Sequence, residues 1–164
     1  MVSFRPALHS DSELILQYIR DLAVAEKFPF QVSVTLLDIE NNLFGENSPA
    51  RAVIFSKGEK PCGFAVYYST FSTTTGRQGL HLDDLYIEPE LQGKGIGKRA
   101  LMYLAQIAKE KGCSRFEWWA LKTNDPAIKF YLGIGAKQLD EISVFRLDQH
   151  QIASLAKDNT LNHT

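Results

Sequence analysis

One stretch of the sequence, ELQGKGIGKR at positions 90–99, has residue types and spacing suited to holding an anion. Its glycines at 93, 95 and 97 carry no side chains, so backbone N–H groups there can approach a ligand closely. The stretch stands between a predicted strand and a predicted helix, and the start of a helix attracts negative charge. These features predict an anion-binding loop; the alternative is a flexible turn before a surface helix.

The charges around the glycines favour the anion site. No Asp or Glu occurs from Leu91 to Lys109, although the first turn of a free helix would normally favour one. Lys94, Lys98 and Arg99 stand there instead, as expected if a bound phosphate group supplies the negative charge. Spacing excludes a P-loop, which needs Ser or Thr where Arg99 stands, and a dinucleotide fingerprint, which needs a third glycine where Lys98 stands.

Two adjacent carboxylates, Asp83 and Asp84, interrupt an apolar run, LHLDDLYI at 80–87. The run predicts an interior strand, on which neighbouring side chains point to opposite faces. Burying a carboxylate there is costly unless it has a partner, so each aspartate needs an explanation. Proton transfer is one; binding to backbone or lysine partners is the other.

Length and composition limit the protein classes. The 164 residues fit one domain, and 18 basic against 19 acidic residues give no indication of nucleic acid or an anionic membrane as a partner. No apolar run approaches the roughly 18 residues of a membrane helix, and we expect a cytoplasmic protein. Cys62 and Cys113 lack metal-ligand spacing, so buried free thiols are expected and no metal site or disulfide framework.

The order of apolar patterns predicts an α/β protein with a mixed sheet of about seven strands and helices on both faces. We expect one domain over residues 1–157 and a short polar tail over 158–164. The expected strands cover 2–8, 50–56, 63–71, 80–87 and 115–121, with one or two closing strands within 137–147. The expected helices cover 12–27, 33–44, 96–111 and 125–134, the last capped by Asp125 with Pro126 at its first position.

The motif Gln92-x-x-Gly95-x-Gly97 resembles the Q/R-x-x-G-x-G/A signature of the GNAT superfamily of acetyl-CoA-dependent N-acetyltransferases. The predicted element order matches that fold, and NDPAIKFY followed by GA resembles its asparagine-helix-tyrosine segment. Four stretches are similar to the diamine/polyamine and thialysine N-acetyltransferase branch: IRDLAVAEK (19–27), GFAVYY (63–68), LDDLYIEPELQGKGIG (82–97) and KGCSRF (111–116). The resemblance implies an acetyl-CoA-dependent transfer to an amine, and a homodimer.

The resemblance also implies a cofactor site for acetyl-CoA. Leu85 and Ile87 would offer backbone groups to the pantetheine arm, and a backbone N–H near Leu85 or Tyr86, at a strand bulge, would stabilise the oxyanion. Asn124 would meet the pantetheine, and Phe130 and Tyr131 would lie near the thioester. The loop around the pyrophosphate would comprise Gln92, Gly93, Lys94, Gly95, Ile96, Gly97 and Lys98.

Catalytic and substrate-binding residues follow from the same resemblance. Asp83 would face the amine as its proton acceptor, directly or through water, while Asp84 would brace a structural network or shape the pocket. Tyr131 would protonate the leaving thiolate, with a plain core aromatic as the alternative. Glu26, Asp83 and Asp84 would form an acidic groove for a small cationic amine: a polyamine, a diamine or a lysine-like amino acid.

Several departures from the branch touch the acceptor side. Threonines (STTTGR, 72–77) replace its tryptophan, Asp83 replaces its glutamate, one residue is inserted after Arg77, and LDEISVF replaces its glutamate-glycine-tryptophan segment. The rival hypotheses are an acetyltransferase for a protein N-terminus or an aminoglycoside, and a non-catalytic CoA-binding sensor. Retention of both Asp83 and Tyr131 favours an enzyme, because a sensor would need only the cofactor loop.

Overall fold

The computed structural model describes residues 1–29 and 31–157, so the predicted tail at 158–164 lies outside the described residues. The chain divides into two compact units, Met1–Ile128 and Lys129–Thr164. Within the described ranges, no helix is both long and apolar enough to cross a membrane.

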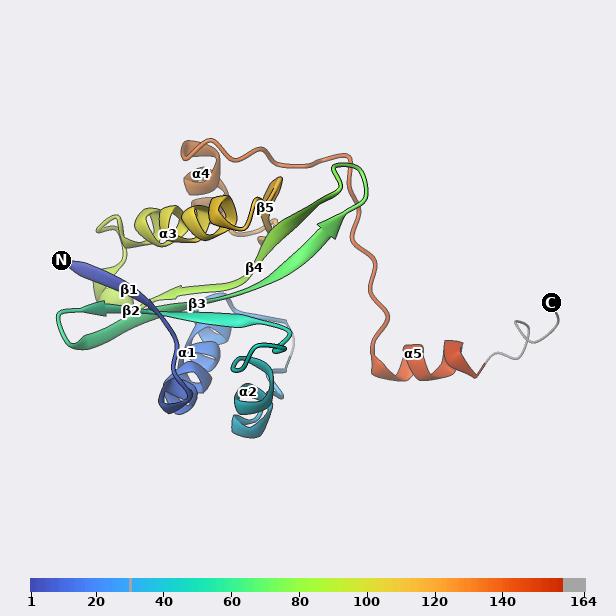
Figure 1. Ribbon diagram of the computed structural model, residues 1–164, viewed down its shortest axis with the longest axis horizontal. Helices are drawn as coiled ribbons and strands as arrows, with labels where there is room; N and C mark the ends of the chain where they lie inside the picture. The colour runs from blue at the N-terminus through green and yellow to red at the C-terminus, as the bar shows by residue number, and fades with distance from the viewer. Residues whose placement is uncertain (30, 158–164) are drawn as a thin grey trace. The chain divides into compact units, whose positions relative to one another are not determined.

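The first unit contains a five-stranded sheet in the order β1-β2-β3-β4-β5 (Figure 1). Neighbouring strands are antiparallel except β4 and β5, which are parallel. A mixed sheet is therefore confirmed, but the expected count of about seven strands is wrong for the described residues. The strands are β1 (Val2–Pro6), β2 (Arg51–Lys57), β3 (Lys60–Ser72), β4 (Arg77–Ile87) and β5 (Arg115–Trp118).

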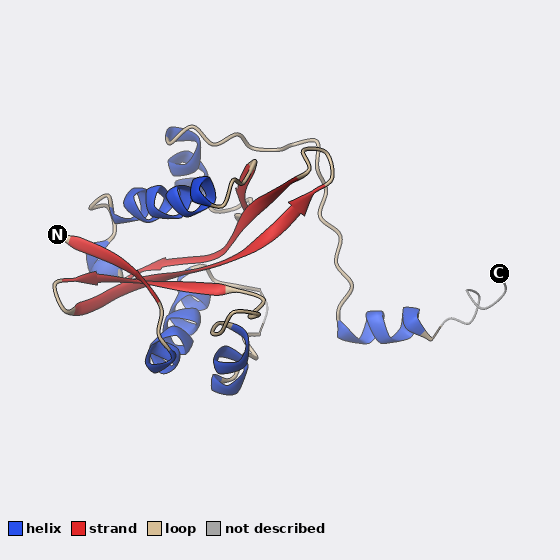
Figure 2. Cartoon of the chain, viewed as in Figure 1, coloured by secondary structure: helices blue, strands red, loops and turns tan. Residues whose placement is uncertain are grey.

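Helices cover both faces of this sheet (Figure 2). After a short 3-10 turn, η1 (His9–Asp11), helix α1 (Ser12–Ala25) packs on β3 and β4. Helix α2 (Leu36–Asn42) contacts α1. Helix α3 (Ile96–Glu110) follows a second turn, η2 (Pro89–Leu91), and contacts β1, β4 and β5. The parallel β4–β5 pair requires such a crossover helix between its strands.

The spacing of apolar residues explains both layers. On α1, Ile15, Tyr18 and Leu22 recur at helical spacing and are buried, in one cluster with alternate residues of the sheet such as Phe64 and Tyr86. On α3, the buried stripe consists of Ile96, Ala100, Leu101, Leu104 and Ala108. The sheet is thus apolar on both faces, and the two helical layers bury it.

The second unit begins within α4 (Asp125–Gly133) and includes α5 (Gln149–Ala156). Residues 137–147, where one or two strands were expected, form no strand. Helix α5 was not predicted, although Asp148 accepts from the Gln151 backbone N–H in a capping box. No described residue from Lys129 to Lys157 is buried.

Candidate active site

The glycine loop has the backbone shape that an anion site requires. Gly93 and Gly95 adopt left-handed conformations with φ of 72° and 76°, and Gly95 is the N-cap of α3. A side chain would be strained at either position. The first N–H groups of α3, at Ile96, Gly97 and Lys98, have no partners within the helix, as at any helix start. The buried Ile96 side chain anchors the loop to the core.

Two polar side chains around the loop form hydrogen bonds to the backbone of neighbouring strands. Gln92 donates from Nε2 to the carbonyl oxygen of Ile87 at 2.9 Å, which ties the loop to the end of β4. Arg99 donates to the carbonyl oxygen of Val2 at 2.6 Å, and its guanidinium lies 5.5 Å from the centre of the Phe4 ring. The grouping of Arg99 with Lys94 and Lys98 as anion-facing charges is therefore corrected: Arg99 joins α3 to β1.

Strand β4 is longer than its parallel partner, and this leaves one of its edges open. The β4–β5 pairing ends at Leu82 opposite Trp118, whereas β4 continues to Ile87 and remains paired with β3. In the part of the chain that the structure describes, no strand pairs with the other edge of residues 83–87. This edge includes Leu85 and Ile87, and their predicted pairing with the pantetheine arm stays a prediction.

The strand also contains a bulge, at Asp83. Tyr67 pairs with Leu82 and Val66 with Asp84, so Asp83 is the extra residue on β4. The bulge lies at Asp83, earlier than the predicted position near Leu85 or Tyr86. Because a bulge twists its strand and disrupts the ladder locally, it explains why β4 and β5 separate beyond Leu82.

The bulge decides which aspartate is enclosed. Asp84 lies opposite Val66, and Tyr86 opposite Phe64, so these residues face the layer that α1 covers. The Asp83 side chain is exposed. Burial, followed by repulsion from the carboxylates of Asp83 and Glu26, raises the pKa of Asp84 to about 7. A carboxyl group with a pKa of about 7 can accept a proton at neutral pH, and the predicted role of Asp83 stays a prediction.

The end of α1 places Glu26 beside this carboxyl group. The Phe28 N–H donates to the Ala23 carbonyl oxygen at 3.0 Å and the Lys27 N–H to that of Val24 at 3.2 Å, which closes the last helical turn. This closure requires one residue in the left-handed conformation, where glycine is usual. Lys27 adopts that conformation, with φ of 50°. Partial burial raises the pKa of Glu26.

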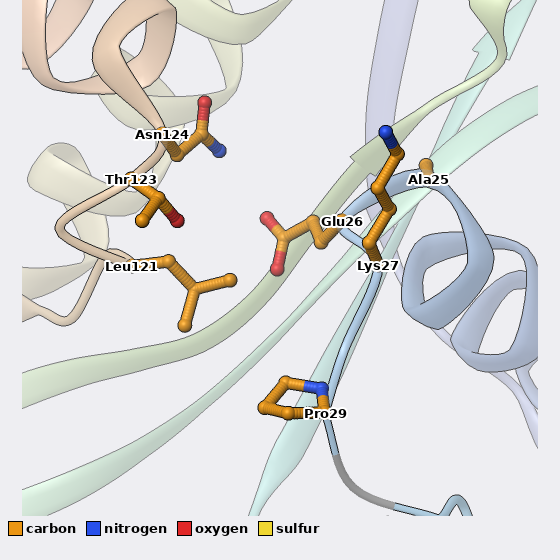
Figure 3. A pocket seen from close by; sticks show the side chains of 7 residues that line it. All are labelled: Ala25, Glu26, Lys27, Pro29, Leu121, Thr123 and Asn124. Carbon is orange, nitrogen blue, oxygen red and sulfur yellow. The ribbon is translucent and has the colours of Figure 1, made fainter.

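A pocket of about 510 Å³ lies next to Glu26 in the first unit (Figure 3). The Glu26 carboxylate extends toward Leu121 and Thr123, whereas the Lys27 amine points in another direction. The predicted residues Glu26 and Asn124 are thus brought to one pocket. Its lining residues are Ala25, Glu26, Lys27, Pro29, Leu121, Thr123 and Asn124.

The start of α4 corrects a predicted cap and fixes Asn124. The Ala127 N–H donates to Oδ1 of Asn124 at 3.3 Å, so Asn124 caps the helix instead of Asp125. This bond leaves the Asn124 side-chain NH₂ group to face the pocket that Asn124 lines. Phe130 and Tyr131 belong to the second unit, where their ring centres lie 5.3 Å apart. Their predicted position near the thioester stays a prediction.

Sequence reasoning did not identify an aromatic group next to Asp83. The buried His81 ring stacks on Tyr68 with ring centres 4.8 Å apart and meets Trp119 edge-on at 5.1 Å. Burial lowers the pKa of His81, so the ring is held neutral, and the Asp83 carboxylate raises it only as a smaller effect. Tyr68 and His81 pair across β3 and β4, and Trp119 follows directly after β5, so the contact becomes visible only once the strand pairing is known.

Comparisons with known proteins agree with this geometry. The chain matches the Acetyltransferase (GNAT) family over residues 16–135. It is 33% identical to a thialysine N-epsilon-acetyltransferase of Sus scrofa, over 94% of this chain and 97% of that protein. It is 30% identical to a human spermidine/spermine N(1)-acetyltransferase-like protein 1, over 93% of this chain but 23% of that longer protein.

A solved structure has the same fold along most of both chains. An integron cassette protein from the mobile metagenome of V. cholerae, VCH_CASS6, superposes with a TM-score of 0.79 and 26% identity, covering 95% of this chain and 98% of that one. The chain therefore belongs to the GNAT acetyltransferase family. The enzyme class predicted from the sequence, an acetyl-CoA-dependent N-acetyltransferase, is confirmed.

Proposed function

We propose that this enzyme moves the acetyl group of acetyl-CoA directly onto the primary amine of a small cationic acceptor. A lysine-like amino acid, a diamine or a polyamine is the expected class. The observation that carries the proposal is the pair of carboxylates, Asp84 and Glu26, which are close enough for Glu26 to raise the pKa of Asp84. The names of the relatives, which refer to thialysine and to spermidine/spermine, support the same class.

The first requirement of the reaction is a neutral amine. An alkylamine with a pKa of about 10.4 is almost fully protonated near neutral pH, so a group that accepts its proton helps directly. Asp84 has a pKa of about 7, close to the value at which a general base works best at neutral pH. We assign it this role, which the sequence had given to Asp83, and leave Asp83 as an exposed second carboxylate.

The second requirement is recognition of the acceptor. Glu26 presents its carboxylate in the pocket, and its raised pKa indicates that it is partly withdrawn from water. A positive group elsewhere on the substrate would relieve the repulsion between Glu26 and Asp84. The acceptor should therefore carry a second cation beyond the reacting amine.

The third requirement is a site for the acetyl donor. The N–H groups at the start of α3, with Lys94 and Lys98 beside them, would hold the pyrophosphate of acetyl-CoA. The open edge of β4 at Leu85 and Ile87 would pair with the pantetheine arm, and Asn124 would add its side-chain amide. Bound acetyl-CoA supplies the activated thioester.

Tyr131 is the proposed proton donor to the leaving thiolate. Tyr131→Phe removes one hydroxyl and keeps the ring, so turnover should fall by about 10- to 10,000-fold. Cofactor affinity, measured by calorimetry, should change little. Wild-type turnover in this variant, under conditions where chemistry limits the rate, would leave Tyr131 a packing residue.

A thiol-release assay with acetyl-CoA tests the acceptor class. We expect kcat/KM for thialysine, lysine, a diamine and spermidine to exceed that for a neutral monoamine of equal length. Peptides with a free N-terminus and an aminoglycoside belong in the panel as rival acceptors. Better use of either rival, or of the neutral monoamine, would reject the cationic small-molecule acceptor, and acetyl-CoA binding without turnover of any amine would favour a sensor.

A further inference from the structure

Tyr68, His81 and Trp119 form an aromatic platform on one face of the sheet in the first unit. Tyr68 pairs with His81 across β3 and β4, so their side chains share a face. The His81 ring stacks on Tyr68 with centres 4.8 Å apart and meets the Trp119 ring edge-on at 5.1 Å. His81 is buried, whereas Trp119 is 60% exposed. The platform therefore presents one indole ring to solvent and supports it with a buried ring.

The platform lies on the side of the sheet that carries Asp84. Because of the bulge at Asp83, His81 before it and Asp84 after it face the same side. Their partners on β3, Tyr68 and Val66, are two residues apart, so the two positions are separated by about 7 Å along the sheet. Val66 belongs to the core beneath α1, but in the described part of the chain Tyr68 does not. The platform thus continues the face of Asp84 past the core that α1 covers.

The platform also adjoins the pocket beside Glu26. Leu121, which lines that pocket, is two residues after Trp119 (Figure 3). Two residues of extended chain span at most about 7 Å, so the indole ring and the pocket are neighbours. An acceptor whose reacting amine lies at Asp84 can therefore reach Trp119 with its other end.

Two carboxylates give the surroundings of the platform a negative charge. Glu117 pairs with His81 across β4 and β5, so its side chain shares the face of the platform. Burial, and then the Asp83 carboxylate, raises the pKa of Tyr68. Burial lowers the pKa of His81, while the carboxylates of Asp83 and Glu117 act in the opposite direction as smaller effects. The buried imidazole is therefore neutral at neutral pH, and the carboxylates beside it attract a cation.

An exposed indole face near carboxylates is suited to binding an ammonium group. The ring face attracts a cation within about 6 Å of its centre, and tryptophan does so best among the aromatic residues. We propose that Trp119 is a specificity-determining residue, whose indole face binds the distal ammonium group of the acceptor while the reacting amine lies at Asp84. This inference rests on the proposed function, and it names the contact of the second cation.

The same surroundings disfavour one kind of acceptor. A lysine-like amino acid carries a carboxylate beside its distal ammonium group, and Asp83 and Glu117 would repel that carboxylate. A diamine has the distal ammonium group alone. We therefore expect the enzyme to prefer 1,5-diaminopentane, which is lysine without its carboxylate, over lysine itself.

Kinetics with three matched amines test the subsite. Lysine, 1,5-diaminopentane and pentylamine share a five-carbon chain and differ at the distal end. In Trp119→Leu, which stays apolar but loses the ring, the ratio of kcat/KM for 1,5-diaminopentane to that for pentylamine should fall by about 2- to 5-fold. Trp119→Phe should retain part of the ratio. Phe71→Leu is the matched control, because Phe71 is 69% exposed and lies on the other face of β3. An unchanged ratio in Trp119→Leu, or a wild type that prefers lysine to 1,5-diaminopentane, would overturn the proposal.

A binding measurement separates this inference from the proposed function. The protein is labelled with 5-fluorotryptophan, and the fluorine NMR signal that is missing from Trp119→Phe identifies residue 119. With CoA present, 1,5-diaminopentane should shift this signal and pentylamine should not. Turnover of the diamine without any such shift would reject the subsite and keep the proposed function. A shift without turnover of any amine would support the subsite and reject acetyl transfer.

Discussion

The two halves of the proposed active site are built in opposite ways. The loop at residues 92–98 uses the backbone of contiguous residues, with Gly95 held left-handed and the first N–H groups of α3 exposed. The carboxylate site uses side chains from separate elements, Glu26 from the end of α1 and Asp84 from beyond the β4 bulge. Backbone sites tolerate little change in local sequence, whereas side-chain sites can change acceptor while the fold stays constant.

The largest expected effect belongs to the side-chain half. Asp84→Asn keeps the shape and removes the proton acceptor, so kcat/KM should fall by about 100- to 10,000-fold with little change in acetyl-CoA affinity. In the wild type, kcat/KM should show a rise through a pKa of about 7, additional to the rise from amine deprotonation, and the variant should lack it. Asp83→Asn is the matched control. A larger loss in Asp83→Asn than in Asp84→Asn would restore the assignment made from sequence.

The same substitution should have the opposite effect on stability. The fold raises the pKa of Asp84 from 3.8 to about 7, so it favours the protonated form. The contribution of Asp84 to the free energy of unfolding is therefore fully present below pH 3.8, the pKa of the unfolded chain. It is lost as the pH rises to about 7, the pKa in the folded protein. Thermal melts at about pH 8 should therefore show Asp84→Asn more stable than wild type, by up to about 4 kcal/mol, with the difference shrinking as pH falls. A variant less stable than wild type at both pH values would contradict this role of burial.

The backbone half is tested by Gly95→Val. A β-branched residue at φ of 76° would reshape the start of α3, and acetyl-CoA should bind at least about 100-fold more weakly. Gly58→Val is the matched control, because Gly58 has φ of 65° in the β2–β3 turn and, like Gly95, open space around its missing side chain. Both variants should lose similar stability. Equal acetyl-CoA affinity in the two, by calorimetry, would remove the loop from the cofactor site.

A smaller effect is expected at Glu26. Removing its charge with Glu26→Gln should lower kcat/KM for a diamine by about 3- to 10-fold, since a partly solvated charge pair contributes roughly 1 kcal/mol. A neutral monoamine should be unaffected, as should a Glu13→Gln control in the first turn of α1. A uniform loss across all amines would make Glu26 a structural residue.

The smallest effect concerns the backbone that presents Glu26. Lys27→Gly would relieve the left-handed strain at φ of 50° and should raise stability by about 1 kcal/mol in urea denaturation. The kinetics with diamines should stay within a factor of about 2, because the Lys27 amine points away from the Glu26 carboxylate. A large rise in KM for diamines would instead show that the lysine shapes the pocket.

The contrast between the two halves also explains what the sequence could predict. The loop could be predicted, apart from the contact of Arg99, because its glycines, its missing acids and its place before α3 are all local features; its role in cofactor binding stays a prediction. The choice between Asp83 and Asp84 depends on one extra residue in the β3–β4 register, which no local pattern specifies. The closing strands at 137–147 were predicted from an apolar alternation, but alternation does not specify a partner strand, and these residues form no strand.

The bulge at Asp83 shifts by one residue the alternation that decides which side chains of β4 face each side of the sheet. Leu82 pairs with Tyr67, and Asp84 with Val66 on the opposite face of β3, although 82 and 84 share the same parity. Even-numbered side chains of β4 therefore face the α3 side before the bulge and the α1 side after it, because the extra residue shifts the two-residue alternation by one. Deleting Asp83 would restore one frame and leave every later side chain facing its present layer. The core therefore does not require the extra residue, and the feature that accompanies it is the opening between β4 and β5 beyond Leu82.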